Sequence, residues 1–147
     1  MIMIREEISN YQINTDSDYI YVENLDFDYI PGFKTLKNLS FKIKKGDAVV
    51  ILGENGSGKS TLFLCLLYLI PRFNGKIIID GIEVTKKNAP NVRKKVGLLF
   101  QDSNDQLFLP SIMDEISFGP HNLGIRGKEL DERINWTLRE LNLQKFK

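Results

Sequence analysis

The sequence is poor in the residues that build metal clusters and disulfide frameworks, because its 147 residues include one cysteine and one histidine. A single cysteine excludes a disulfide within the chain, and so small a set excludes a Cys/His metal cluster. Cys65 lies in an apolar stretch, where we expect a small core residue rather than a nucleophile or a metal ligand. His121 has no acidic or hydroxyl partner at motif spacing, so we assign it no role.

The sequence also lacks a surplus of charge and a long apolar run. Its 20 basic and 19 acidic residues give a formal charge of +1, which favours neither nucleic acid nor an anionic membrane as a partner. The longest apolar stretch, residues 62–70, is far shorter than the roughly 20 residues that span a bilayer. At the N-terminus, Glu6 and Glu7 precede any apolar core of the signal type. These features predict one soluble or peripheral domain that does not bind nucleic acid.

The most informative feature is the run GENGSGKST at residues 53–61, which fits the phosphate-loop pattern G-x-x-x-x-G-K-[ST]. Glycines let backbone N–H groups approach phosphate oxygens, and the N-terminus of a following helix adds further N–H groups and a favourable dipole. We expect Lys59 to contact the β- and γ-phosphates, Ser60 to ligate Mg²⁺, and Thr61 to donate to the α-phosphate. The predicted nucleotide-binding residues of this run are Gly53, Glu54, Asn55, Gly56, Ser57, Gly58, Lys59, Ser60 and Thr61.

The alternative is a chance match in a glycine-bearing loop, and the flanking sequence argues against it. Residues 48–52 form an unbroken apolar run, which predicts a strand buried on both faces of a parallel sheet. Residues 62–70 are apolar nearly all round, which predicts a helix buried beneath that sheet and ended by Pro71. Motif and context together indicate a nucleoside triphosphate site.

The remaining sequence predicts a mixed α/β architecture. Residues 25–29 and 39–44 alternate between apolar and polar side chains, as half-buried antiparallel strands do. A further strand is expected at residues 76–80, closed by an Asp-Gly turn, and the apolar residues 96–100 suit the central sheet. Helical spacing predicts an amphipathic helix over residues 128–142. Its apolar positions are Leu130, Ile134, Leu138 and Leu141.

The order of these segments resembles the nucleotide-binding domain of ABC transporters. An aromatic residue precedes two strands, the phosphate loop follows, and a Phe-Gln pair comes after an apolar strand. The segments LLFQDSNDQLF at residues 98–108, EISFGP at 115–120 and NLG at 122–124 are similar to the ATPase subunits of energy-coupling-factor importers, which take up cobalt, nickel or water-soluble vitamins. The resemblance covers about residues 19–147. It implies an α/β fold of the P-loop NTPase type with an antiparallel β subdomain.

The resemblance assigns roles to two residues outside the phosphate loop. Tyr29 takes the place of the aromatic residue that stacks on adenine, and a ring face suits a flat base. Gln101 takes the place of the glutamine that ligates Mg²⁺ or orients the attacking water. Gln101 and Lys59 are the implied catalytic residues, and Ser60 and Gln101 the implied Mg²⁺ ligands. The alternatives are an ordinary aromatic residue at a strand edge for Tyr29, and a polar residue capping a strand for Gln101.

The resemblance also implies partners. Residues 102–124 would face a transmembrane scaffold subunit, with Leu107, Phe108 and Leu109 as apolar anchors. The alternative is that these side chains fill the core of the chain's own helical subdomain. A second ATPase subunit, identical or different, would complete the ATP sites. The implied location is cytoplasmic and peripheral, on the inner face of the cell membrane.

Several motifs of the family are missing from the sequence. These are a signature loop of the Leu-Ser-Gly-Gly-Gln type, the acidic motif that supplies an Asp and a catalytic Glu, and a switch histidine. We therefore expect an ABC domain truncated before the signature motif, with an extension at residues 1–18, a core at 19–101 and the start of the helical subdomain at 102–147. Such a chain would contact Mg-ATP but hydrolyse it slowly or not at all alone. Its exposed apolar surface would favour marginal stability or association.

Three functions fit these expectations. The first is the N-terminal part of an importer ATPase. The second is a non-catalytic or regulatory nucleotide-binding module that pairs with a full-length relative. The third, an ABC-type ATPase acting on DNA or ribosomes, is disfavoured by the balanced charge and by the match at residues 101–124. In such importers a membrane subunit selects the substrate, so this sequence does not identify it.

Overall fold

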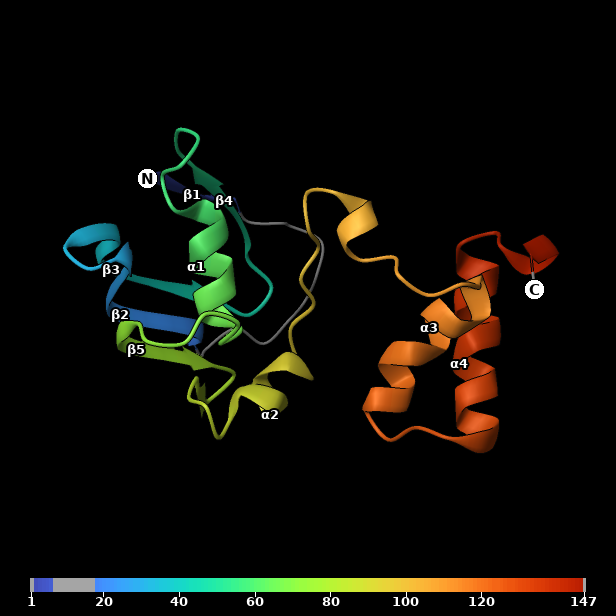
Figure 1. The fold of residues 1–147 in the computed structure, drawn as a ribbon. Coiled ribbons are helices and arrows are strands. Elements are labelled where there is room, and N and C mark those ends of the chain that lie inside the picture. The colour runs from blue at the N-terminus through green and yellow to red at the C-terminus, as the bar shows by residue number, and fades with distance from the viewer. Residues whose placement is uncertain (1, 7–17, 147) are drawn as a thin grey trace. The chain divides into compact units, whose positions relative to one another are not determined.

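The computed structural model describes residues 2–6 and 18–146 and contains two compact units, Met1–Gly97 and Leu98–Lys147 (Figure 1). The phosphate loop and Tyr29 belong to the first unit. Gln101 and the segment implied to contact a membrane subunit belong to the second.

A four-stranded antiparallel sheet is the base of the first unit. Its strands are β2 (Asp18–Ile30), β3 (Phe33–Lys44), β5 (Asn74–Ile79) and β6 (Ile82–Glu83), in the order β3-β2-β5-β6. The two predicted antiparallel strands, at residues 25–29 and 39–44, and the further strand expected at residues 76–80 are thereby confirmed. The predicted Asp-Gly turn joins β5 to β6, and both of its residues have positive φ, as a two-residue hairpin turn requires.

A separate two-stranded sheet leads to the phosphate loop. β1 (Ile2–Glu6), within the predicted extension, pairs antiparallel with β4 (Ala48–Leu52); residues 1 and 7–17 of that extension lie outside the described residues. The prediction that β4 is buried on both faces of a parallel sheet is wrong, since Val50 and Leu52 are each 46% exposed. In the part of the chain that the structure describes, β1 is the only strand paired with β4, and one neighbour cannot cover it.

Helix α1 (Lys59–Leu66) packs its apolar side chains on the four-stranded sheet and closes the main core. Cys65 is fully buried there, which confirms it as a core residue. Burial raises the pKa of its thiol to about 11, so the reactive thiolate is scarce at neutral pH. The buried core residues are Val22, Leu25, Phe27, Leu36, Leu62, Cys65, Leu66, Ile77, Ile79, Val84 and Val92.

The predicted helix over residues 62–70 ends early, at Leu66. Tyr68 has a φ of +54°, and the N–H of Leu69 donates to the carbonyl oxygen of Leu64 at 2.9 Å. The N–H of Tyr68 donates to the carbonyl of Cys65 at 3.0 Å, which completes a Schellman motif. The left-handed residue therefore ends the helix before Pro71 is reached.

The remaining elements are all helical, and two of them, α3 (Ile112–Asn122) and α4 (Gly127–Glu140), are longer than the others. The first unit also contains α2 (Ala89–Arg93). The second unit contains η1 (Ser103–Asp105), α3, α4 and η2 (Gln144–Phe146). Helix α4 confirms the predicted amphipathic helix and ends two residues before the predicted end.

Helices α3 and α4 pack on each other around a small core. Leu130, Ile134 and Leu138 of α4 are buried at the predicted spacing, whereas Leu141 is exposed because it follows the last helical residue. The partly buried residues around them are Ile112, Met113, Ile116, Ile125 and Leu143.

The apolar run at residues 96–100 was predicted to be a strand of the central sheet, and this is wrong. The structure has no strand at these positions, and Leu99 is 84% exposed. A strand needs a hydrogen-bonded neighbour, and none of the described strands pairs with this run. Among the described residues, no helix is long and apolar enough to cross a membrane.

Candidate functional site: the phosphate loop

The phosphate loop runs from the end of β4 to the start of α1. Gly56 and Gly58 have φ values of +81° and +92°, in the left-handed region that favours glycine. A Cβ on Gly58 would lie 2.9 Å from Cδ2 of Leu36 and 3.0 Å from the carbonyl oxygen of Thr35. The loop therefore lies directly on β3, and only glycine fits at the position that enters the helix.

Lys59 folds back over the loop. Its Nζ donates to the carbonyl oxygen of Gly53 at 2.6 Å and to that of Glu54 at 2.8 Å. These bonds hold the ammonium charge beside the backbone from which the loop is built. Phosphate oxygens are stronger acceptors for an ammonium group than amide carbonyls are, because the hydrogen bond is then charged on both sides.

The N-terminus of α1 is open, in contrast with that of α3. Gly58 precedes α1 and has no side chain to cap it, and no acidic residue lies in the first turn. In α3, by contrast, Ser111 Oγ accepts from the N–H of Asp114 at 3.1 Å. The first N–H groups of a helix have no partner within the helix. Those of α1, with their dipole, are thus suited to an anion.

Two hydroxyl groups of the loop bear on the fit of a nucleotide. Ser57 Oγ is buried, and the described residues offer it no hydrogen-bond partner. A phosphate oxygen would supply the missing partner, so the loop fits a bound phosphate. Ser60 is exposed at the first turn of α1. No group of three or more His, Cys, Asp or Glu residues in the described part of the chain could hold a metal. The exposed hydroxyl of Ser60 fits Mg²⁺ as one oxygen ligand beside phosphate oxygens.

Tyr29 lies near the end of β2 and reaches the first turn of α1. Its Oη is 3.2 Å from Oγ1 of Thr61, and its ring meets that of Phe27 edge-on, with centroids 4.8 Å apart. The ring is nevertheless exposed, with 60% of its surface accessible. An open pocket of about 450 Å³ lies beside it. Phe27, Asp28, Tyr29, Pro31, Ile70, Pro71 and Arg72 line this pocket.

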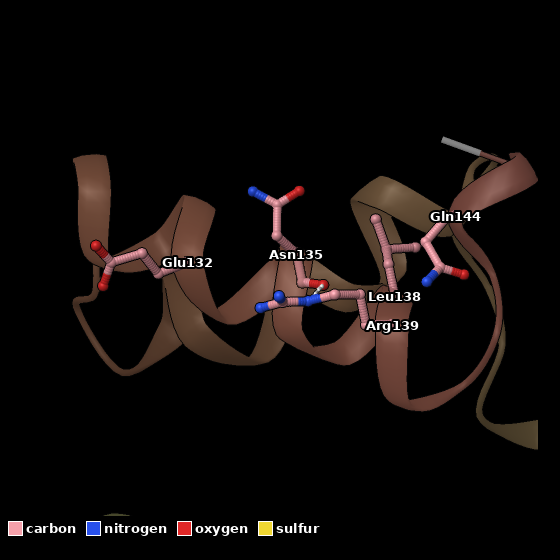
Figure 2. A pocket seen from close by; sticks show the side chains of 5 residues that line it. All are labelled: Glu132, Asn135, Leu138, Arg139 and Gln144. Carbon is pink, nitrogen blue, oxygen red and sulfur yellow. Dashed lines mark hydrogen bonds between the residues drawn. The ribbon is translucent and has the colours of Figure 1, made fainter.

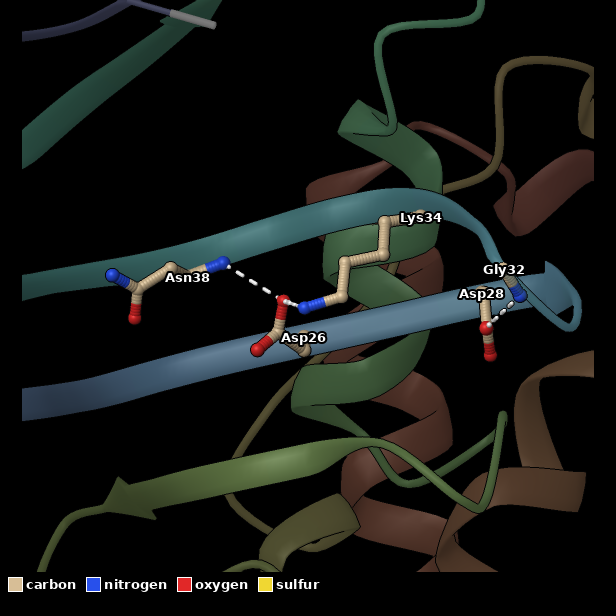
Figure 3. Close-up of polar contacts among 5 residues, drawn as sticks. All are labelled: Asp26, Asp28, Gly32, Lys34 and Asn38. Carbon is tan, nitrogen blue, oxygen red and sulfur yellow. Dashed lines mark hydrogen bonds and ion pairs between the residues drawn. The ribbon is translucent and has the colours of Figure 1, made fainter.

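The hairpin that carries Tyr29 is braced by two carboxylates (Figure 3). Asp26 Oδ1 accepts from Lys34 Nζ at 2.6 Å and from the N–H of Asn38 at 3.1 Å. Asp28 Oδ2 accepts from the N–H of Gly32 at 3.1 Å, which fixes the turn after β2. Sequence reasoning missed these braces, although the alternation of residues 25–29 places both aspartates on the face opposite Phe27 and Tyr29.

Gln101 is exposed in the second unit, and its role with Mg²⁺ stays a prediction. The segment around it is braced by Gln106, which sequence reasoning missed. Gln106 Oε1 accepts from the N–H of Phe100 at 3.2 Å, and Nε2 donates to the carbonyl of Leu98 at 2.9 Å. Both bonds fix the backbone on the N-terminal side of Gln101.

Leu107 and Phe108, two of the three expected anchors, are exposed and are not part of the α3–α4 core. The rings of Phe108 and Phe118 meet edge-on with centroids 5.2 Å apart. Leu109 is half-buried, and its N–H donates to Glu115. His121 is exposed.

A second open pocket, of about 530 Å³, lies along α4 and η2 (Figure 2). It contains no residue predicted for the nucleotide site, and the Nε of Arg139 donates to the backbone carbonyl of Asn135 at 3.3 Å. The phosphate loop has both the motif and the geometry, so we place the candidate site there. The residues lining the second pocket are Glu132, Asn135, Leu138, Arg139 and Gln144.

Comparison with known proteins identifies the family of the chain. The profile of the ABC transporter family matches residues 36–147, a range that includes the phosphate loop and Gln101 but not Tyr29. A putative ABC transporter ATP-binding protein of Clostridium acetobutylicum is 43% identical over 128 residues, which are 86% of this chain and 46% of that protein. The energy-coupling factor transporter ATP-binding protein EcfA of Methanocaldococcus jannaschii is 40% identical over 129 residues, again 86% of this chain and 46% of that protein.

A solved structure confirms the predicted fold. CbiO1 of Clostridium perfringens, described as part of the ABC transporter complex CbiONQ, matches with a TM-score of 0.72 and 32% identity. The match covers 89% of this chain and 53% of CbiO1. This chain thus spans about half the length of the relatives that it matches, and the resemblance to energy-coupling-factor ATPases is confirmed. On its phosphate loop, its fold and the family match, the chain belongs to the ABC transporter family of ATP-binding proteins.

Proposed function

We propose that the chain binds Mg-ATP at residues 53–61, as the nucleotide-binding part of an energy-coupling-factor importer for a metal ion or a vitamin. The observation that carries the proposal is the position of Lys59, whose Nζ is held by two carbonyl oxygens of the loop beside an uncapped helix N-terminus. Its ammonium, the first amides of α1 and the unpartnered hydroxyl of Ser57 all favour a polyphosphate.

Within this site each residue has a distinct task. Lys59 neutralises charge on the β- and γ-phosphates, and Ser60 ligates Mg²⁺ together with phosphate oxygens. Tyr29 offers a ring face to adenine, which its exposure allows. For Gln101, which belongs to the second unit, the resemblance to the family implies an amide that would serve Mg²⁺ or the attacking water. Bound Mg²⁺ would neutralise the charge of the phosphates.

The proposed partners follow from the relatives. CbiO1 is part of a transporter complex, and the EcfA proteins bear the name of a transporter. We propose that this chain likewise works with a second ATPase subunit and a membrane scaffold at the inner face of the cell membrane. The exposure of Leu107 and Phe108 supports residues 102–124 as the scaffold-facing surface, because these two side chains do not fill the chain's own core.

The proposal is tested by calorimetric titration of the chain with Mg-ATP. We expect saturable binding that Lys59→Ala weakens at least about tenfold, because the loss of a charged hydrogen bond costs about 1.5–3 kcal/mol. Lys37→Ala, a change at an exposed lysine of β3, is the control and should bind as the parent does. Equal affinity of the parent and Lys59→Ala would refute the site. We also expect little ATP hydrolysis by the chain alone, and rapid turnover that depends on Lys59 would contradict that.

A further inference from the structure

Two hydroxyl groups from distant parts of the chain meet above the start of α1. Tyr29 Oη lies 3.2 Å from Thr61 Oγ1, across 32 positions of sequence. The two residues differ sharply in burial, because Tyr29 is 60% exposed and Thr61 only 6%. The tyrosine thus presents its ring to solvent while its hydroxyl contacts a buried group of the phosphate loop.

Packing on both sides holds this contact. Along β2 the side chains of Leu25, Phe27 and Tyr29 share one face, and the edge of one aromatic ring meets the other at 89°. Thr61 lies on the buried face of α1 together with Cys65, one turn further on. All of these residues belong to the first compact unit. The bond therefore joins a tyrosine whose ring contacts buried Phe27 to a hydroxyl on the buried face of α1.

The chemistry of a phosphate gives the bond its direction. A hydroxyl can donate one hydrogen bond and accept two, whereas an ionised phosphate oxygen only accepts. When Thr61 serves a phosphate it must donate to it, and its oxygen must then accept from Tyr29. The phenol is the more acidic of the two hydroxyls and so the better donor. Hydrogen bonds in such a chain strengthen one another.

We propose that the hydroxyl of Tyr29 is a positioning group for the phosphate site. It donates to Thr61 Oγ1 and thereby turns the proton of Thr61 toward the phosphate bound in the loop. This inference rests on the proposed function and adds a second task to Tyr29, since the ring serves the base and the hydroxyl serves the phosphate. Tyr29 consequently contributes to the binding of a ligand that has no base.

The test compares Mg-ATP with Mg-tripolyphosphate, which has the phosphates but neither base nor sugar. Both are titrated calorimetrically into the whole chain and into Tyr29→Phe, which keeps the ring and removes only the hydroxyl. We expect Tyr29→Phe to weaken both ligands by the same factor, about three- to tenfold, the range of one hydrogen bond. Tyr29→Ala, which also removes the ring, should weaken ATP by a larger factor than tripolyphosphate.

Variants of Thr61 show whether the effect passes through its hydroxyl. In a Thr61→Val background, Tyr29→Phe should cause no further loss of affinity for either ligand, whereas in Thr61→Ser the loss should persist. A purely structural role would make the two changes non-additive in the thermal unfolding of the free protein and leave tripolyphosphate affinity unchanged. Unfolding curves of each variant also confirm that it folds.

The outcomes separate this inference from the proposed function. If the parent protein binds neither ligand, both the proposed function and this inference are refuted. If the parent binds Mg-ATP and Lys59→Ala binds it at least about tenfold more weakly, the proposed function stands. In that case an unchanged tripolyphosphate affinity in Tyr29→Phe, or an equal loss in the Thr61→Val background, overturns this inference alone.

Discussion

The Nζ of Lys59 lies 2.6 Å from the carbonyl oxygen of Gly53, so the loop's own backbone positions the charge that we propose to contact a phosphate. A second carbonyl, that of Glu54, accepts from the same nitrogen at 2.8 Å. Two acceptors this close to one atom suit a compact ammonium with three donors. A planar guanidinium is larger and directs its donors in one plane.

Lys59→Arg therefore separates geometry from charge. It keeps the positive charge, yet we expect Mg-ATP affinity to fall about tenfold or more, because the guanidinium cannot take the place of the ammonium between the two carbonyls. Calorimetric titration measures the change, with Lys37→Arg on β3 as the control. Parent-like affinity of Lys59→Arg would mean that charge alone carries binding.

Gly58→Ala should cost more stability than Gly56→Ala. Both glycines have left-handed φ, so a side chain adds about 1–2 kcal/mol of strain at either site. At Gly58 the new Cβ would also crowd Leu36 and the backbone of Thr35, for about 1–3 kcal/mol more. Nothing lies within 4 Å of the Cβ position at Gly56 or at Gly97, and Gly97 has no left-handed φ.

The single cysteine offers a local measurement of this difference. Cys65 is fully buried in the same unit, so its labelling by a thiol reagent in increasing urea reports opening of the first unit. We expect protection to be lost at the lowest urea concentration in Gly58→Ala, next in Gly56→Ala, and last in Gly97→Ala and the parent. Equal midpoints for the first two variants would show that the crowding is absent.

Asp26 makes part of the stability dependent on pH. The hydrogen bond from Lys34, followed by that from the N–H of Asn38, lowers the pKa of Asp26 below its ordinary value of 3.8. A carboxyl whose pKa is lower in the folded protein than in the unfolded chain stabilises the fold. This stabilisation is complete when the pH is above the pKa of the carboxyl in the unfolded chain. That stabilisation is lost as the pH falls through the folded value.

Asp26→Asn should therefore lower the Tm at neutral pH, and the gap to the parent should narrow below about pH 4. Thermal unfolding followed by circular dichroism from pH 2 to pH 7 measures this gap. Lys34→Met should reproduce the narrowing in part, whereas Lys37→Met, on the same strand, should keep a constant offset. A gap that is independent of pH would show that the ion pair does not form.

The sequence predicts elements well where one segment carries its own signal. Alternation along β2 and β3 and helical spacing in α4 correctly locate these elements. The end of α1 was predicted wrongly because the left-handed residue that ends it is Tyr68, and tyrosine does not favour a left-handed φ. Helices α3 and α4 end in the same way at Gly124 and Asn142, residue types that do favour left-handed φ.

Relations between distant segments are harder to predict. The apolar runs at residues 48–52 and 96–100 predict buried strands. The sequence does not indicate which neighbouring strand would pair with each run and bury it. The hydrogen bond between Tyr29 and Thr61 joins the end of a strand to the start of a helix. Neither a tyrosine nor a threonine in the sequence indicates which distant residue it will contact. The sequence therefore predicts which residues belong to the proposed phosphate site, and the structure adds the contacts that hold Lys59, Tyr29 and Thr61 in place.

The last prediction concerns the second unit, whose core rests on three buried side chains of α4. Leu138 is 1% exposed and Leu141 is 59% exposed, so truncation of the two gives a matched pair. Leu138→Ala should cost about 2–5 kcal/mol and unfold this small unit, whereas Leu141→Ala should change stability by less than about 0.5 kcal/mol.

Trp136, the only tryptophan, lies on α4, so its fluorescence reports unfolding of the second unit while Cys65 labelling reports the first. In Leu138→Ala we expect an early fluorescence transition with protected Cys65, and Mg-ATP binding that persists and is weakened only by the loss of Gln101 as a partner of Mg²⁺. The reason is that the contacts of Lys59 and of Tyr29 with Thr61 all lie within residues 1–97. Loss of Cys65 protection in this variant, but not in Leu141→Ala, would show that the first unit needs the second to stay folded.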